Sequence, residues 1–281
     1  MVAPHDLRIP GWEPERGPRS PDPGERAGCA AAIRVSLVGV GTRGKYDTEF
    51  YAWQAAPARA SAAVVVPVIL EAVGPVHSVL DVGCGIGAWL AEWSAAGVAD
   101  VYGVDGDYVE RAELLVPPEK FQAHDLTEPL DLGRRFDLVT SFEVAEHLPE
   151  EKADQFVASL VRHADVVAFS AAIPGQGGVG HVNEQWQGYW ARKFADLGFE
   201  AHDDVRWKVW ENPNVEFWYA QNTVLYARPG RVASAPSHPF EVAHPGYEAH
   251  RRELPTKWKL WEAMPEGFRR QARAARGKLP I

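Results

Sequence analysis

The chain of 281 residues lacks several features that would define its function at once. It has only two cysteines, Cys29 in a proline-rich segment and Cys84 in a glycine-rich turn, so we expect no disulfide framework. It also lacks a basic excess, because its net charge is −9. Binding a long polyanion normally needs a clustered basic face, so nucleic acid is a disfavoured partner.

Long hydrophobic runs are scarce as well. We expect no run of this sequence to be long and apolar enough to span a membrane. The N-terminus has no apolar stretch after its first charges, which argues against a signal peptide. These absences predict a cytoplasmic protein that does not act at a membrane.

The composition divides the chain into three regions. Residues 1–45 begin with many Pro, Arg, Glu and Gly residues and predict a flexible extension, because such a segment buries too little apolar surface to offset its ordering entropy. Residues 46–230 have the length and composition of one α/β domain. Residues 231–281 predict a linker followed by a basic helix over Lys257–Lys278. That helix suits a solvated surface, a docking element in a homodimer, or a surface that attracts an anionic substrate.

Within the central region, apolar strands alternate with helical segments. The expected strands are Ser78–Val82, Asp100–Val104, Lys120–Ala123, Phe136–Ser141 and Val166–Ser170, and the expected helices are a region from Thr48, Ala62–Ala72, Glu151–Arg162 and Gln185–Leu197. This alternation predicts a mostly parallel sheet with helices on both faces. Two later aromatic runs, Phe199–Trp210 and Val215–Ala227, predict an antiparallel hairpin at one edge of the sheet.

The most informative motif is the glycine turn after the first expected strand, where Asp81 precedes Gly83, Gly85 and Gly87. Glycines suit a tight turn in which the backbone lies against a ligand, and a helix then begins whose N–H groups face that ligand. A second acidic residue, Asp105, ends the next strand. The pattern is typical of a nucleoside-containing cofactor. A dinucleotide is the less favoured ligand, because the turn lacks the second half of the dinucleotide motif.

A cluster of acidic residues and histidines follows the fourth strand. Glu143, Glu146 and His147 are three and four positions apart, so they share one side if this stretch is helical. His181 follows the fifth strand after a glycine-rich loop. Ligands sit at the carboxyl ends of strands in open α/β folds, so these four side chains could enclose a divalent cation. A catalytic histidine without a metal, or a purely structural cluster, are the alternatives.

The two acidic strand ends and the glycine turn resemble those of class I S-adenosylmethionine-dependent methyltransferases, over roughly residues 46–230. The Glu-x-x-Glu-His segment with its later histidine also resembles the small-RNA 3′-terminal 2′-O-methyltransferases and, in its first half, the ubiquinone-type O-methyltransferases. The residues after His181 differ from the RNA family. The resemblance implies a Rossmann-like α/β fold and S-adenosylmethionine as cofactor.

The resemblance also implies roles for particular residues. Cofactor-binding residues would be Asp81, Gly83, Gly85, Gly87, Asp105, Asp125 and Glu143; Asp105 would accept hydrogen bonds from the ribose hydroxyls, and Asp125 from the adenine amino group. Metal ligands would be Glu143, Glu146, His147 and His181, with His147, His181 and Glu146 also catalytic. The ion would be Mg²⁺ or Mn²⁺, with Fe²⁺ or Zn²⁺ less favoured. For each aspartate, a helix cap or turn is the alternative role.

These expectations favour an O-methyltransferase that acts on a hydroxyl group of a small molecule, such as a sugar or a glycosylated natural product. A bound cation would lower the pKa of an alcohol that is otherwise a weak nucleophile. Aromatic residues are the candidate substrate walls, with packing in the core as the alternative role of each: Trp186, Tyr189, Trp190, Trp207, Trp210, Trp218 and Tyr219. The alternatives are transfer to a terminal RNA ribose, transfer without a metal to an amine or hydroxyl, and a cofactor-binding partner protein without catalysis.

Overall fold

The computed structural model describes residues 48–237, 239 and 241–253, all within one compact unit. Its strands are β1 (Ser78–Val82), β2 (Asp100–Asp105), β3 (Phe121–Ala123), β4 (Leu138–Phe142), β5 (Val166–Ser170), β6 (Glu200–His202) and β7 (Val224–Ala227). Its α-helices are α1 (Thr48–Val73), α2 (Ala88–Ala95), α3 (Ala153–His163), α4 (Gln187–Asp196), α5 (Asp204–Val209), α6 (Phe217–Asn222) and α7 (Pro245–Glu253). The predicted extension over residues 1–45 and the predicted basic helix Lys257–Lys278 lie outside the described residues.

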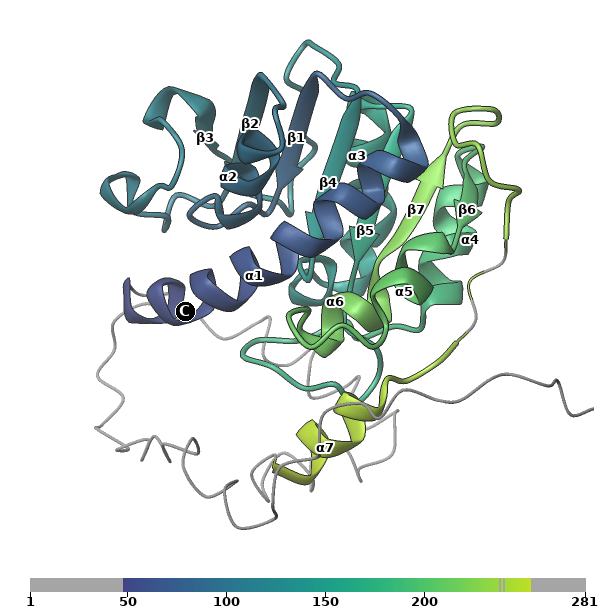
Figure 1. Cartoon of the computed structure of the whole chain (residues 1–281). Helices are drawn as coiled ribbons and strands as arrows, with labels where there is room; N and C mark the ends of the chain where they lie inside the picture. Colours follow the sequence, from purple (N-terminus) through teal and green to yellow (C-terminus); the bar gives the residue numbers. More distant parts are fainter. Residues whose placement is uncertain (1–47, 238, 240, 254–281) are drawn as a thin grey trace, which may run out of the picture. The chain divides into compact units, whose positions relative to one another are not determined.

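The strands form one seven-stranded sheet in the order β3-β2-β1-β4-β5-β7-β6 (Figure 1). Strands β1 to β5 run parallel, whereas β7 is antiparallel to both β5 and β6. This confirms the predicted α/β class with a mostly parallel, Rossmann-like sheet and an antiparallel edge. The strand order reverses between β1 and β4, which is where ligands bind in open α/β folds.

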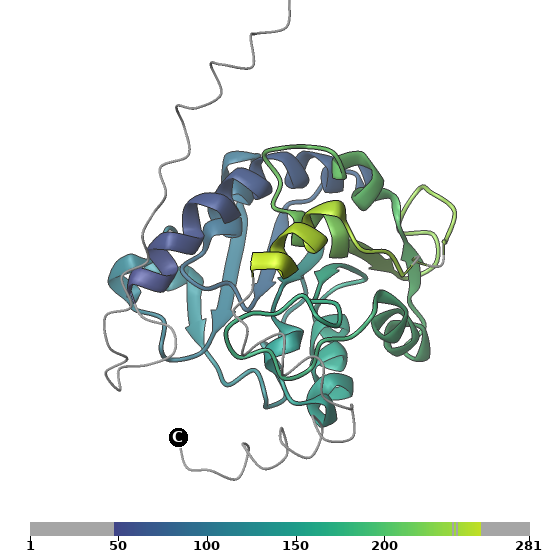
Figure 2. The same ribbon diagram turned by 90° about the horizontal axis from the view of Figure 1, so that it is seen from below.

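Helices cover both faces of the sheet, and Figure 2 shows α1 and α3 on opposite sides of it. Along the buried strands, successive side chains enter different cores: Val79 of β1 packs with residues of α1 and α2, whereas Leu80 packs with residues of α3 and α4. The same alternation holds in β5, where Ala168 and Phe169 enter opposite cores. Because both faces are covered, the central strands β1, β4 and β5 bury mainly apolar side chains on both sides.

The region from Thr48 is one continuous helix, α1, where the sequence predicts two, and Pro57 and Pro67 lie inside it. A stripe formed by Ala62, Val65, Val66 and Ile69 is at most 1% exposed, and the helix packs on α2 and α5. Burial of this stripe offsets the backbone hydrogen bonds that the prolines remove.

The expectation that no segment is long and apolar enough to cross a membrane is wrong for α1. Its segment Ala55–Val73 meets that test by length and composition. The core helix of a globular domain also meets it, and one third of this segment is buried inside the structure. The length and composition of this segment therefore show that α1 is apolar and no more.

The predicted hairpin at the sheet edge is correct in its pairing but wrong in its connection. Strands β6 and β7 pair antiparallel, with Glu200 opposite Ala227. Most of the two aromatic runs, however, forms the helices α5 and α6 in place of long strands joined by a short turn. The predicted linker also contains a helix, α7.

Candidate functional site

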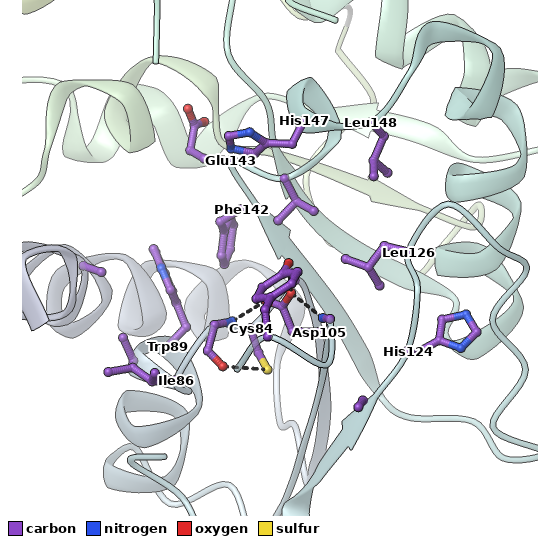
Figure 3. Close-up of a pocket in the computed structure, with 18 of the residues that line it drawn as sticks. Cys84, Ile86, Trp89, Asp105, His124, Leu126, Phe142, Glu143, His147 and Leu148 are labelled. Carbon is purple, nitrogen blue, oxygen red and sulfur yellow. Dashed lines mark hydrogen bonds between the residues drawn. The ribbon is translucent and has the colours of Figure 1, made fainter. Parts of the chain in front are cut away.

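A cavity of about 670 Å³ opens at the carboxyl ends of β1, β2 and β4 (Figure 3). Its walls come from the glycine turn, the segments after β2, β3 and β4, and residues of α1, α2 and α6. The volume is that of a typical small-molecule site. Of the predicted site residues, those that line it are Gly83, Gly85, Asp105, Asp125, Glu143 and His147.

The turn after β1 needs its glycines. Gly83, Gly85 and Gly87 have φ values of 84°, 53° and 87°, a region that side chains disfavour. A Cβ at Gly83 would also lie 2.3 Å from a methyl group of Val144. The backbone N–H of Gly85 donates to Asp105 at 2.6 Å, so the two predicted halves of the cofactor site are directly joined.

Asp105 lies at the centre of this wall. Its carboxylate accepts hydrogen bonds from the backbone N–H groups of Gly85 (2.6 Å) and Gly106 (2.7 Å) and from the Tyr108 hydroxyl (2.5 Å). Burial raises the pKa of Asp105, although these three hydrogen bonds oppose the rise. Asp81 is different: it does not line the cavity but lies buried behind the turn, where Thr140 donates to it at 2.7 Å.

Tyr108 is a site residue that sequence reasoning missed. It lines the cavity, and a Cβ at Gly106 would lie 2.1 Å from its ring, so Gly106 makes room for it. Its place in the sequence, three residues after the acidic end of β2, could have predicted this role. Asp125 also lines the cavity, and its carboxylate accepts from the N–H and hydroxyl of Thr127 at 2.9 and 2.7 Å. These bonds lower the pKa of Asp125 and close a turn. An adenine contact for Asp125 stays a prediction.

Three of the four predicted metal ligands meet. The potential ligand atoms of Glu146, His147 and His181 all lie within 4.8 Å of one another. Glu146 and His147 lie in a short 3₁₀ turn, Ala145–His147, and not in an α-helix. The rings of the two histidines have centroids 4.9 Å apart, and the His181 Nε2 lies 4.0 Å from a Glu146 oxygen.

Glu146 is the most unusual member of this cluster. Its side chain is fully buried, and neither carboxylate oxygen accepts a well-formed hydrogen bond from the residues described. Burial raises its pKa well above the usual range, and the nearby charge of Glu143 adds to the rise; the backbone amides of Glu146 and Ala172 offset only part of it. A buried carboxylate with so little hydrogen bonding is costly unless a proton or a cation accompanies it.

Glu143 lies outside this group of three. Its carboxylate accepts from the side-chain amides of Gln176 (2.7 Å) and Asn222 (3.1 Å), which sequence reasoning missed. It is the one non-glycine residue with positive φ, 55°, among the described residues. Such strain is common at functional sites. Figure 3 shows Glu143 and His147 on the same side of the pocket.

Little of the predicted aromatic substrate wall lies at this cavity. Of its members, only Tyr219 lines the cavity. Trp190 is a core residue packed against Phe169, and Trp207 is 49% exposed on α5. Besides Tyr108, the cavity takes its other large rings from Trp89 and Phe142, whose centroids are 4.1 Å apart. They stand directly after the glycine turn and at the end of β4, so their proximity to the two motifs was the available signal.

Comparisons with known proteins bear on the domain and the fold. Residues 48–166 match the family model of a methyltransferase domain. DesVI of Streptomyces venezuelae has a similar structure (TM-score 0.50, 16% identity), covering 64% of this chain and 95% of that one. The sugar N-methyltransferase KedS8 of Streptoalloteichus is also similar (TM-score 0.50, 18% identity; 68% and 98% covered). At these identities the likeness concerns the fold. No curated protein sequence matches the chain.

The domain match and the shared fold indicate a methyltransferase that uses S-adenosylmethionine. The cavity fits such a cofactor. The glycine turn leaves room that a Cβ would fill, and the Asp105 carboxylate can accept hydrogen bonds from hydroxyl groups, as it does from Tyr108. When bound, S-adenosylmethionine supplies an electrophilic methyl group on a sulfonium.

Proposed function

We propose that the enzyme methylates a hydroxyl group of a small sugar-like or glycosylated molecule, and that Glu146, His147 and His181 hold a divalent cation that assists the reaction. One observation carries this proposal: the buried Glu146 carboxylate, without a well-formed hydrogen bond, faces two imidazoles beside the cofactor cavity. One of these imidazoles, that of His147, lines that cavity.

The donor set suits a cation. One carboxylate and two imidazoles are ligands of Mn²⁺, Fe²⁺ and Zn²⁺, and three protein ligands leave positions open for substrate oxygens. A cation held there would lower the pKa of a substrate hydroxyl group. Glu143 as a fourth ligand stays a prediction, since its carboxylate would have to exchange the amides of Gln176 and Asn222 for the cation.

The chain's own residues supply the remaining steps. His147 is the imidazole on the cavity wall, so in the absence of a cation its ring nitrogen would accept the proton of a substrate hydroxyl group. Glu143, anchored by two amides, offers a fixed acceptor on the same wall. The rings of Trp89, Phe142 and Tyr219 pack together beside them and exclude water from part of the cavity.

The proposal of a sugar-like substrate rests on the charge of the chain and on the aromatic side chains of the cavity. The net charge of −9 disfavours a polyanion, and the aromatic wall suits the apolar face of a sugar or a flat ring. KedS8 is described as a sugar N-methyltransferase, which supports a sugar-bearing acceptor. A second candidate is transfer to an amine without a metal, with His147 as the base, because His147 alone of the three cluster residues lines the cavity.

The test begins with calorimetry of S-adenosylmethionine binding, followed by a Mn²⁺ titration read by electron paramagnetic resonance. A labelled-methyl assay then compares glycosides, amino sugars and RNA with a free 3′ ribose, with and without EDTA. We expect Glu146→Ala and His181→Ala to abolish Mn²⁺ binding and turnover while cofactor affinity changes little. Matched surface variants, Glu119→Ala and His77→Ala, should behave as wild type. Full activity in EDTA would refute the cation, and a product methylated on nitrogen would support the second candidate.

A further inference from the structure

The loop that carries His181 is organised around one carboxylate, that of Glu184. The backbone N–H groups of Gly175 and Gly177 each donate to it at 2.8 Å, and the His181 Nδ1 lies 2.9 Å from the same oxygen as the Gly177 N–H. The Glu184 side chain is only 10% exposed. Three groups from a glycine-rich loop therefore converge on one buried acceptor.

The opposite side of the His181 ring is fixed by Gly178. A Cβ at Gly178 would lie 2.1 Å from the His181 Nε2, so only glycine leaves space for the ring in this position. The ring is thus held between the backbone of residue 178 and the Glu184 carboxylate. In this position its Nε2 is the nitrogen that faces Glu146, at 4.0 Å.

We infer that Glu184 is a positioning residue, which fixes a hydrogen on the Nδ1 of His181 and so leaves Nε2 as the nitrogen that faces Glu146 and His147. An ionised carboxylate has only acceptor atoms, so the nitrogen beside it must carry the hydrogen. A neutral imidazole has a single N–H, and its other nitrogen is then free to bind a cation or a proton. Outer carboxylates orient metal-binding histidines in this way. The cation part of the inference rests on the proposed function, but the tautomer does not.

Nitrogen-15 NMR of the imidazoles tests the tautomer directly, with the His181 signal assigned by its loss in His181→Gln. We expect His181 to carry its hydrogen on Nδ1 in the wild type, and to lose that preference in Glu184→Ala. In Glu184→Gln the remaining carbonyl oxygen should keep the tautomer while the charge is lost. Glu119→Ala is the matched control. A wild-type His181 that is protonated on Nε2, or a Glu184→Ala variant with an unchanged tautomer, would overturn the inference.

A Mn²⁺ titration of the same variants separates the two proposals. Glu184→Ala should weaken Mn²⁺ binding roughly tenfold to a hundredfold, the usual effect of removing such an outer carboxylate. Gly178→Ala should weaken it as well, because the new methyl group displaces the ring while Glu184 remains. If wild-type protein binds no Mn²⁺ yet shows the expected tautomers, the cation fails and the role of Glu184 stands. Unchanged cofactor affinity, measured by calorimetry, shows that the variants are folded.

Discussion

Gly83→Ala should disturb the cofactor turn and the acidic segment together. Gly83 has φ +84°, and an added Cβ would lie 2.3 and 2.8 Å from the two methyl groups of Val144. Val144 directly follows Glu143 and is 9% exposed, so it has little room to move away. The methyl group would therefore push apart the glycine turn and the segment that carries Glu143 and His147.

The cost has two parts. An alanine in the left-handed region costs roughly 1–2 kcal/mol, and overpacking of a filled core costs about 1–3 kcal/mol. Gly83→Ala should thus lower the free energy of unfolding by about 2–5 kcal/mol. Gly74→Ala is the matched control, because Gly74 has φ +80° but nothing within 4 Å of its Cβ position. The Gly74→Ala variant should lose only the roughly 1–2 kcal/mol of stability that the left-handed backbone conformation costs.

Urea unfolding of Gly83→Ala, Val144→Ala and the double variant measures the steric part. Val144→Ala in the Gly83→Ala background should recover about 1–3 kcal/mol relative to the sum of the single losses, because the clashing methyl groups are gone. Cofactor affinity should fall in Gly83→Ala and recover in part in the double variant. Additive losses within about 0.5 kcal/mol, or a Gly83→Ala variant as stable as Gly74→Ala, would refute the steric coupling.

Three further predictions concern the carboxylates. Burial raises the pKa of Asp81 from 3.8 to about 7, so the stability associated with its neutral form is complete below pH 3.8 and lost as the pH rises through 7. In urea unfolding at pH 5 and pH 8, Asp81→Asn should reduce this fall by up to about 3 kcal/mol, and an unchanged fall would contradict the assignment. Asp105→Asn should weaken cofactor binding in calorimetry by about 1–3 kcal/mol, because an amide oxygen cannot accept from both the Gly85 and the Gly106 N–H as the carboxylate does. Glu146→Gln should raise the melting temperature at pH 8 and abolish Mn²⁺ binding; a lower melting temperature with intact Mn²⁺ binding would argue against a buried charge at this position.

The parallel core of the fold could be predicted from local sequence. The strands Ser78–Val82 and Val166–Ser170 have the predicted bounds, because each is a short apolar run that ends at glycine, serine or an acidic residue. The region 203–223 could not be assigned from its composition. It is rich in aromatic and branched residues, yet α5 forms there with Val205 and Val209 buried on one face. Intrinsic strand preference is weak, and packing against α1 decides in favour of the helix.

The site divides in the same way. The glycine turn, Asp105 and the Glu146–His147 pair are short-range features, so the amino-acid sequence by itself determined that a glycine turn, an acidic residue and an acidic-histidine turn stand at the ends of β1, β2 and β4. Only the tertiary structure decided which groups pair. Glu143 takes its partners from Gln176 and Asn222, 33 and 79 residues away, and thereby leaves the group formed by Glu146, His147 and His181. No local pattern encodes such contacts, because they depend on how the loops after β4 and β5 pack against α6.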